Sequence, residues 1–276
     1  MATNSNIPAE QASNMTPNYE VKLLLKPNEV HSSENGLTST VLAAFDIRPG
    51  VIKQTIQYLD TNEKDLYAAG WSARIRKTEN EDGVELAYKK RYAMEDHDID
   101  AALTKANKDG FDASAGKYDA QVEWGYQKKT LSISRKKSAD FNASGMELPD
   151  ESRSRAMLVE EAPTKFDDFG GNKWGTGLLA TSRLFGPVNA KRYVGKWEGT
   201  RIYLEVWTLR NAQGTGFENL VEASFKTETR MDASQKHASL ISHLQREGWF
   251  LAQDSLRTQL IMERYGKMSS VNGNLG

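Results

Sequence analysis

The chain has 276 residues, of which 38% are hydrophobic and 26% charged, and its net charge of -1 comes from 36 basic and 37 acidic residues. This composition allows a sizeable buried core, and the even charge balance argues against a protein that binds polyanions with its whole surface. The absence of cysteine excludes disulfides, thiol catalysis and thiolate metal sites, and no apolar run is long enough to span a bilayer.

The N-terminal residues 1–17 are polar, lack periodicity and do not resemble a secretory signal, so we expect a disordered tail and a cytoplasmic protein. Short helices are expected at 41–45 and 63–70, the second ended by Gly70. Alternation of apolar and polar residues predicts strands in the first half of the chain at 18–27, 51–61, 71–77 and 84–92.

A long strand, or two strands that meet near Gly125, is expected at 117–137, between helices at 98–110 and 151–163. The second half then repeats the strand pattern and ends in helices. These strands lie at 188–197, 200–210 and 220–230, and these helices at 232–248 and 252–266.

The chain contains no linker rich in Pro, Gly or Ser, so we expect one domain at 18–266 and a flexible tail at 267–276. Strands that follow one another through short turns predict antiparallel pairing and an α+β fold. Charged faces on many strands favour a closed barrel, because closure removes the sheet edges.

Five predicted strands carry charge on one face and apolar groups on the other. The charged faces combine Glu20 with Lys22, Arg74 with Arg76, Glu85 with Lys89, Tyr203 with Glu205 and Trp207, and Glu222 with Ser224 and Lys226. An ordinary half-buried sheet with a solvent face also predicts such alternation. The residue types favour an enclosed site, since Arg and Lys bind phosphate oxygens while carboxylates bind the accompanying Mg²⁺.

The order of several motifs resembles the CYTH domain, the family of triphosphate tunnel metalloenzymes. The first half contains "YEVKLLL", "QYLDT", "LYAAGWSARIRK" and "ELAYKKRY", and the second half aligns through "AKRYVGKW", "IYLEVW" and "LVEASFK". The resemblance covers most of residues 18–230, and it implies that the C-terminal helices pack on the outside. It implies a closed eight-stranded antiparallel β-barrel with surrounding helices, a tunnel that binds a triphosphate and cleaves it with Mg²⁺ or Mn²⁺.

The resemblance also assigns roles to single residues. Glu20, Glu205 and Glu222 match metal ligands. Catalytic and phosphate-binding positions match Lys22, Arg74, Arg76, Lys89 and Arg192, and we add Lys226, Tyr203 and Trp207 as substrate-binding residues on the same faces. Asn18 and Ser224 stand where the family has two further carboxylates, so the remaining three favour one metal ion over two.

We therefore expect a divergent CYTH-like enzyme, dependent on Mg²⁺ or Mn²⁺, that acts on a phosphoanhydride, with hydrolysis favoured. Tyr203 and Trp207 leave open a repurposed tunnel that ionises or cyclises an organic diphosphate of isoprenoid type. A non-catalytic module that binds a phosphorylated ligand is the third alternative. The basic run at 126–137 is expected to line the tunnel, and neither nucleic acid nor membrane is an expected partner.

Overall fold

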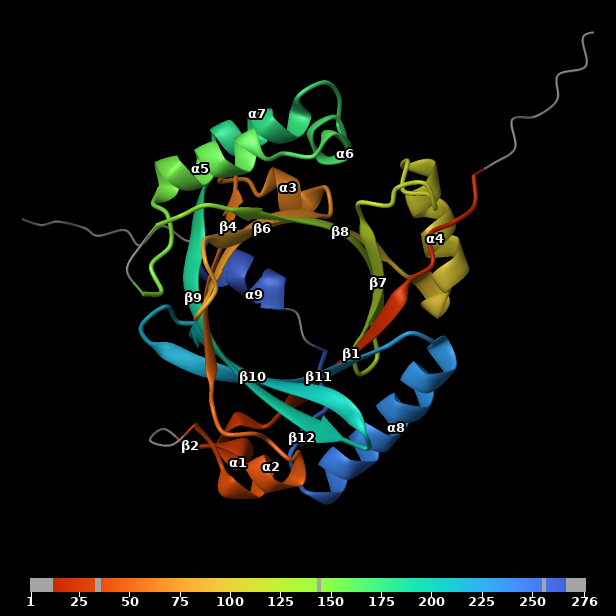
Figure 1. Ribbon diagram of the computed structural model, residues 1–276, viewed down its shortest axis with the longest axis vertical. Helices are drawn as coiled ribbons and strands as arrows, with labels where there is room; N and C mark the ends of the chain where they lie inside the picture. Colours follow the sequence, from red (N-terminus) through yellow and green to blue (C-terminus); the bar gives the residue numbers. More distant parts are fainter. Residues whose placement is uncertain (1–11, 33–35, 143–144, 255–256, 267–276) are drawn as a thin grey trace, which may run out of the picture.

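The computed structural model describes residues 12–32, 36–142, 145–254 and 257–266, and its central feature is a closed β-barrel (Figure 1). Around the ring the strands follow the order β11-β10-β9-β4-β5-β6-β8-β7-β1, and β1 pairs again with β11 to close it. These strands are β1 (Asn18–Leu25), β4 (Ile52–Asp60), β5 (Trp71–Thr78), β6 (Val84–Ala93), β7 (Asp119–Trp124), β8 (Lys129–Ala139), β9 (Arg183–Trp197), β10 (Thr200–Arg210) and β11 (Phe217–Thr227).

The α+β class and the closed barrel agree with the prediction, but the predicted eight antiparallel strands are wrong in number and in one pairing. Nine described strands form the ring, and β1 runs parallel to β7, with Val21 opposite Trp124. The extra strand arises because the segment 117–137 folds as two strands that meet near Gly125, the second of the two predicted alternatives, and these form the hairpin of β7 and β8. Its turn is closed by a hydrogen bond from the Gly125 amide to the Lys128 carbonyl oxygen at 2.8 Å.

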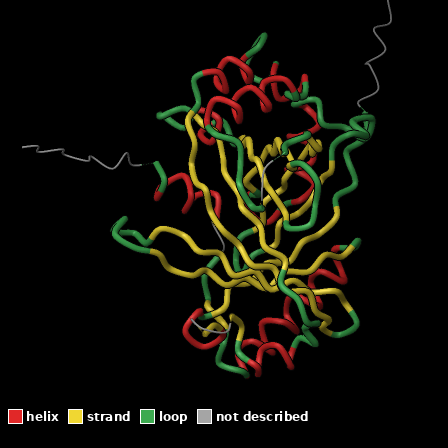
Figure 2. The backbone as a smooth tube through the Cα atoms, turned by 60° about the vertical axis from the view of Figure 1, so that its left-hand side comes forward, coloured by secondary structure: helices red, strands yellow, loops and turns green. Residues whose placement is uncertain are grey.

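Most of the helices lie on the outside of the ring, with one group above it and another below it in both views (Figures 1 and 2). They are α1 (Pro27–Val30), α2 (Ser39–Ala44), α3 (Asp65–Ala68), the short 3₁₀ helix η1 (Glu95–His97), α4 (Ile99–Lys108), α5 (Glu151–Glu160), α6 (Thr164–Asp167), α7 (Trp174–Ala180), α8 (Arg230–Arg246) and α9 (Arg257–Arg264). The short strands β2 (His31–Ser32) and β3 (Gly36–Leu37) form a separate ribbon, and β12 (Phe250–Leu251) pairs with β1. Among the described helices, none is both long and apolar enough to cross a membrane.

The main hydrophobic core lies between the outer face of the barrel and these helices. The outward-facing residues Val21 and Leu23 of β1 are buried, as is Ile75 of β5, and all three belong to one cluster with Leu240 and Leu244 of α8. Alternation along each strand places the other side chains inside the barrel. On most of the barrel strands the apolar face thus stabilises the fold from outside, which leaves much of the interior available for polar residues.

The expectation that both C-terminal helices pack on the outside is wrong for α9. Viewed along the barrel it lies within the ring of strands (Figure 1), and its Ile261 and Met262 share a second hydrophobic cluster with Ile56 of β4, Val188 of β9 and Trp207 of β10. This packing closes one end of the barrel. It also brings the first turn of α9 to the barrel interior.

The residues just before β1 contact α4. The Asn107 side-chain amide donates hydrogen bonds to the Ala12 carbonyl oxygen at 2.7 Å and to Asn14 Oδ1 at 2.9 Å. Residues 12–17, assigned to the tail by the sequence, therefore have contacts to the folded part. The remainder of that tail and residues 267–276 lie outside the described residues, and the division into one domain and two tails stays a prediction.

Candidate functional site

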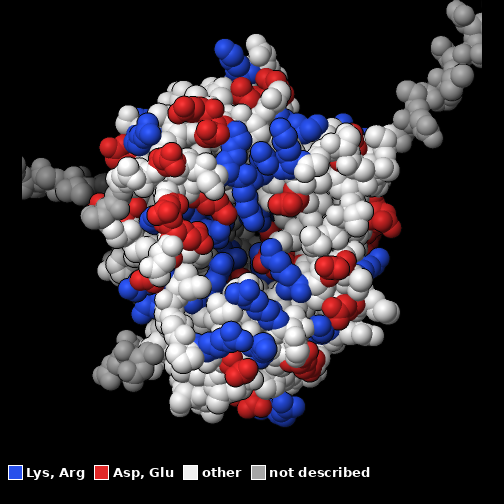
Figure 3. Space-filling model, in the orientation of Figure 1, with Lys and Arg blue, Asp and Glu red and all other residues white. Residues whose placement is uncertain are grey.

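A cavity of about 360 Å³ lies inside the barrel. Every residue that the sequence assigns to the site lines this cavity except Glu222, which lies buried on β11. The charged faces of separate strands thus converge on one enclosed space. Around the mouth that faces the viewer in Figure 3, Lys and Arg side chains gather on a hollowed surface.

The cavity is strongly basic although the chain as a whole is slightly acidic. Its described lining contains nine Lys and Arg side chains but three Glu and no Asp. The cations are Lys22, Arg74, Arg76, Lys89, Arg91, Lys136, Arg192, Lys226 and Arg257. Such an excess of positive charge within low-dielectric walls attracts and concentrates a multiply charged anion.

Two arginines on β5 are held in place by a carboxylate on the neighbouring strand β6. Arg74 Nη2 lies 2.6 Å from Glu85 Oε1, and Arg76 Nη2 lies 2.9 Å from Glu85 Oε2. The Nε atoms of both arginines are buried and have no hydrogen-bond partner among the described residues. Because buried donors are normally satisfied, these two N–H groups point to an anionic ligand.

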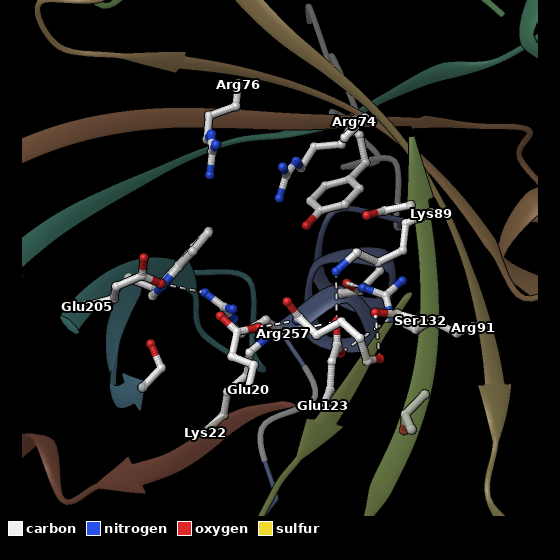
Figure 4. A pocket seen from close by; sticks show the side chains of 18 of the residues that line it. Glu20, Lys22, Arg74, Arg76, Lys89, Arg91, Glu123, Ser132, Glu205 and Arg257 are labelled. Carbon is white, nitrogen blue, oxygen red and sulfur yellow. Dashed lines mark hydrogen bonds and ion pairs between the residues drawn. The ribbon is translucent and has the colours of Figure 1, made fainter. Parts of the chain in front are cut away.

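A second cluster surrounds Glu123 of β7. Its Oε1 lies 2.7 Å from Lys89 Nζ and 3.8 Å from Lys22 Nζ, and its Oε2 lies 3.8 Å from Arg91 Nε. Burial raises the pKa of Glu123, but the three cations outweigh burial and hold it well below its usual range. Glu123 therefore anchors the cations that face the cavity (Figure 4).

The two lysines next to Glu123 respond to it differently. Burial lowers the pKa of Lys22, but Glu123 and Glu20 outweigh burial and raise it to about 12. Burial also lowers the pKa of Lys89, and there the Glu123 carboxylate does not compensate, so the pKa falls to about 8. Lys89 is thus a cation that can lose its proton close to neutral pH.

A third cluster surrounds Glu205 of β10, which binds guanidinium groups on both sides. Its Oε1 lies 2.6 Å from Arg192 Nη2, and its Oε2 lies 2.7 Å from Arg257 Nη1. The Trp207 indole donates a hydrogen bond of 2.9 Å to the same Oε2. Burial raises the pKa of Glu205, but Arg257 and Arg192 lower it further, to about 2.

The three predicted metal ligands are in contact with the chain's own polar side chains. Glu205 and Glu222 both bind Arg257, while Glu20 pairs with Lys22 at 2.8 Å and accepts a hydrogen bond from Gln121. Within the described ranges, no group of three His, Asp or Glu side chains is spaced to hold a metal. The carboxylates instead order the chain's own cations.

The two positions where carboxylates are missing differ in their surroundings. Ser224 lies on the cavity wall directly opposite Lys22 in the β1–β11 pair. Asn18 is exposed at the start of β1 and is not part of the described lining. A carboxylate at Asn18 would therefore stand away from the site that the sequence assigns to it.

The aromatic residues on β10 are covered by guanidinium groups. The guanidinium carbons of Arg192 and Arg201 each lie 5.2 Å from the ring centre of Tyr203. Trp207 is 5% exposed, and Arg257 lies 4.5 Å from its ring centre. These rings order cations through cation–π contacts, and little of Trp207 is open to an apolar ligand.

Of the five basic residues in the segment 126–137, Lys136 lines the cavity. Ser134 and Lys136 of β8 line the cavity, whereas Leu131 and Ile133 are buried on the outer face of the same strand. Alternation on one strand therefore supplies both the tunnel wall and the outer core.

Several residues of the site were not predicted. Residues two apart on a strand share a face. Glu123 therefore faces the interior together with Gln121, and Arg91 together with Lys89. The same pattern, applied to every strand, would have found them. For Arg257 no local signal exists, because it begins a helix whose position depends on tertiary packing.

No protein-family model and no curated protein matches the sequence. Among solved structures, HpAC1 from Hippeastrum, described as a candidate adenylyl cyclase with a dominant triphosphatase activity, matches with a TM-score of 0.52 and 15% identity over 92% of this chain and 98% of that chain. A candidate adenylate cyclase from Bacillus halodurans matches with a TM-score of 0.50 and 12% identity over 91% of this chain and 98% of that one. At these identities the likeness shows a shared fold. The chain thus has the tunnel fold of the CYTH-type proteins that its motifs resemble.

Proposed function

We propose that the protein binds a linear phosphoanhydride, a triphosphate or longer polyphosphate, inside the barrel and hydrolyses it. The observation that carries this proposal is the pair Arg74 and Arg76, whose buried Nε donors lack partners among the described residues at the wall of a basic cavity. Guanidinium groups match phosphate oxygens in geometry as well as in charge. The triphosphatase activity described for HpAC1, which has the same fold, supports this class of substrate.

The chemistry follows from the placement of charge. Transfer of a phosphoryl group spreads negative charge over the transferred and leaving oxygens, and fixed cations stabilise that charge without reorganisation. Arg74, Arg76 and Arg192 would hold the phosphates in line. Lys89, with a pKa of about 8, suits transfer of a proton to the leaving phosphate, because a general acid works best near the ambient pH.

The isoprenoid alternative has less support from the cavity. An isoprenoid chain needs an apolar pocket, yet the described lining is mostly charged or polar, and Tyr203 and Trp207 contact guanidinium groups. Dependence on Mg²⁺ or Mn²⁺, a cytoplasmic location and the absence of nucleic-acid and membrane partners stay predictions from the sequence.

The proposed function is tested by measuring phosphate release from inorganic triphosphate, longer polyphosphate, nucleoside triphosphates and an isoprenoid diphosphate. We expect release from the inorganic compounds and none from the isoprenoid diphosphate. Each substrate is tried with a chelator and with added Mg²⁺ or Mn²⁺. Tight binding of triphosphate without any release would identify the non-catalytic module, and release from the isoprenoid compound alone would refute the proposal.

The affinity for triphosphate should fall as the pH rises through about 8, because the free protein then loses the Lys89 proton. A bound polyanion favours the charged amine, so binding near this pH should take up a proton. Calorimetry in two buffers of different ionisation enthalpy measures that uptake. Lys89→Arg keeps its charge in this range and should lose the pH dependence, and an unchanged profile in this variant would exclude Lys89 as its source.

A further inference from the structure

Two buried carboxylates stand side by side in the barrel wall. Glu205 of β10 and Glu222 of β11 are directly opposite each other in the antiparallel pair, and they are 4% and 1% exposed. Like charges at such positions repel, and burial adds a cost for each ionised group. A cation between them is therefore required if both are to stay ionised.

The guanidinium of Arg257 lies in that position. Its Nη1 is 2.7 Å from Glu205 Oε2, and its Nη2 is 3.2 Å from Glu222 Oε1. In Figure 4 it is linked to Glu205 and lies next to Glu20, the third predicted metal ligand. One planar cation thus reaches the set of carboxylates that the sequence assigns to a divalent ion.

The acceptor capacity of Glu205 is already used. Oε1 receives Arg192 Nε at 2.7 Å and Nη2 at 2.6 Å, while Oε2 receives Trp207 Nε1 at 2.9 Å and Arg257 Nη1 at 2.7 Å. A carboxylate offers about four lone-pair positions, so four donors leave none for a metal. A divalent ion would have to displace a guanidinium from its ion pairs.

The position of Arg257 is fixed by packing as well as by charge. It is the first residue of α9, whose Ile261 and Met262 are buried within the closed end of the barrel. Trp207 both covers its guanidinium and donates to Glu205. The cation is therefore held by a helix, an aromatic ring and two carboxylates.

We propose that Arg257 is the resident cation of this site, in the place that the sequence assigns to Mg²⁺ or Mn²⁺, and that the phosphoanhydride binds without a divalent ion. The part that concerns the ligand rests on the proposed function. The part that concerns the carboxylates does not, because it follows from contacts within the chain. The remaining cavity cations supply the positive charge that a metal ion would otherwise bring to the phosphates.

The first experiment titrates Mn²⁺ alone into the native protein by calorimetry, with no phosphate compound present. We expect no binding at millimolar Mn²⁺. In Arg257→Ala, Glu205 and Glu222 lose their shared cation, and a Mn²⁺ site should appear. Saturable binding of one Mn²⁺ by the native protein would overturn the proposal, whatever the variant does.

The second experiment measures the affinity for inorganic triphosphate with and without a chelator. The native affinity should be unchanged by the chelator, whereas that of Arg257→Ala should fall on the order of a hundredfold in chelator and recover in Mg²⁺. Arg257→Lys keeps a cation and should stay independent of metal. A native affinity that collapses in chelator would refute the proposal.

Arg264→Ala is the matched control, since Arg264 lies on the same helix and pairs at 2.7 Å with Glu218 outside the described cavity lining. It tests whether loosening α9 alone creates a Mn²⁺ site, and we expect none. A Mn²⁺ site in this variant would mean that helix docking, not the Arg257 charge, keeps metal out. If the native protein binds no triphosphate, the proposed function fails, but the titration with Mn²⁺ alone still decides the role of Arg257.

Discussion

Replacing Arg74 or Arg76 by alanine should weaken the binding of inorganic triphosphate by roughly 2–5 kcal/mol while leaving the fold nearly intact. Each side chain brings a charge and a buried Nε donor to the cavity wall. Loss of one arginine leaves the other to pair with Glu85, so the carboxylate keeps a partner. Calorimetric titration with triphosphate measures the loss, and thermal unfolding without ligand reports on the fold.

Arg135→Ala is the control for this prediction. Arg135 lies on β8, next to the cavity residues Ser134 and Lys136, but its side chain donates to the Lys117 carbonyl oxygen and is not part of the described lining. We expect its affinity for triphosphate to match that of the native protein. Equal affinities in the native protein and in both cavity variants would make Arg74 and Arg76 structural residues.

Replacing Glu123 by glutamine should destabilise the protein by roughly 3 kcal/mol. This value is at the lower end of the range for breaking a buried ion pair, because the Glu123 side chain is still 18% exposed. The variant leaves Lys22, Lys89 and Arg91 close together without their shared carboxylate. Triphosphate should then raise the unfolding temperature of the variant more than that of the native protein, because the ligand replaces the lost negative charge.

The surface pair of Glu161 and Lys137 offers a matched comparison. Their charged atoms are 2.9 Å apart and the Glu161 side chain is 38% exposed, so Glu161→Gln should cost about 1 kcal/mol or less. Thermal and denaturant unfolding of both variants gives the two costs. Equal and small costs would show that Glu123 does not anchor the cavity cations.

Much of the cavity wall could be predicted because a strand has a period of two residues. Once Val21 and Leu23 are assigned to a core, Glu20 and Lys22 must share the opposite face, and the same reasoning places Arg74 and Arg76 together. The ends of helices could also be predicted from local signals. Gly70, which has a positive φ of 75°, follows the end of α3 and precedes β5. These features depend on residues that are close in the sequence.

The sequence left the strand count open. It allowed one long strand or two strands at 117–137, and the turn after Gly125 becomes necessary when β7 pairs in parallel with β1 and antiparallel with β8. The course of α9 was missed, because the same apolar face could have packed on the outside of the barrel as well as inside its end. Both outcomes depend on which surfaces are left to be buried after the barrel closes.

The sequence by itself determined which side chains face the interior and that this interior would be basic, because alternation and residue type are local properties. Only the tertiary structure decided which charges meet. In the sequence, Glu205 and Glu222 resemble metal ligands. In the structure, α9 places Arg257, which is 52 residues after Glu205 in the chain, between the two carboxylates. The pairing of buried charges depends on distances of a few ångströms between segments far apart in the chain, and neither periodicity nor composition contains those distances.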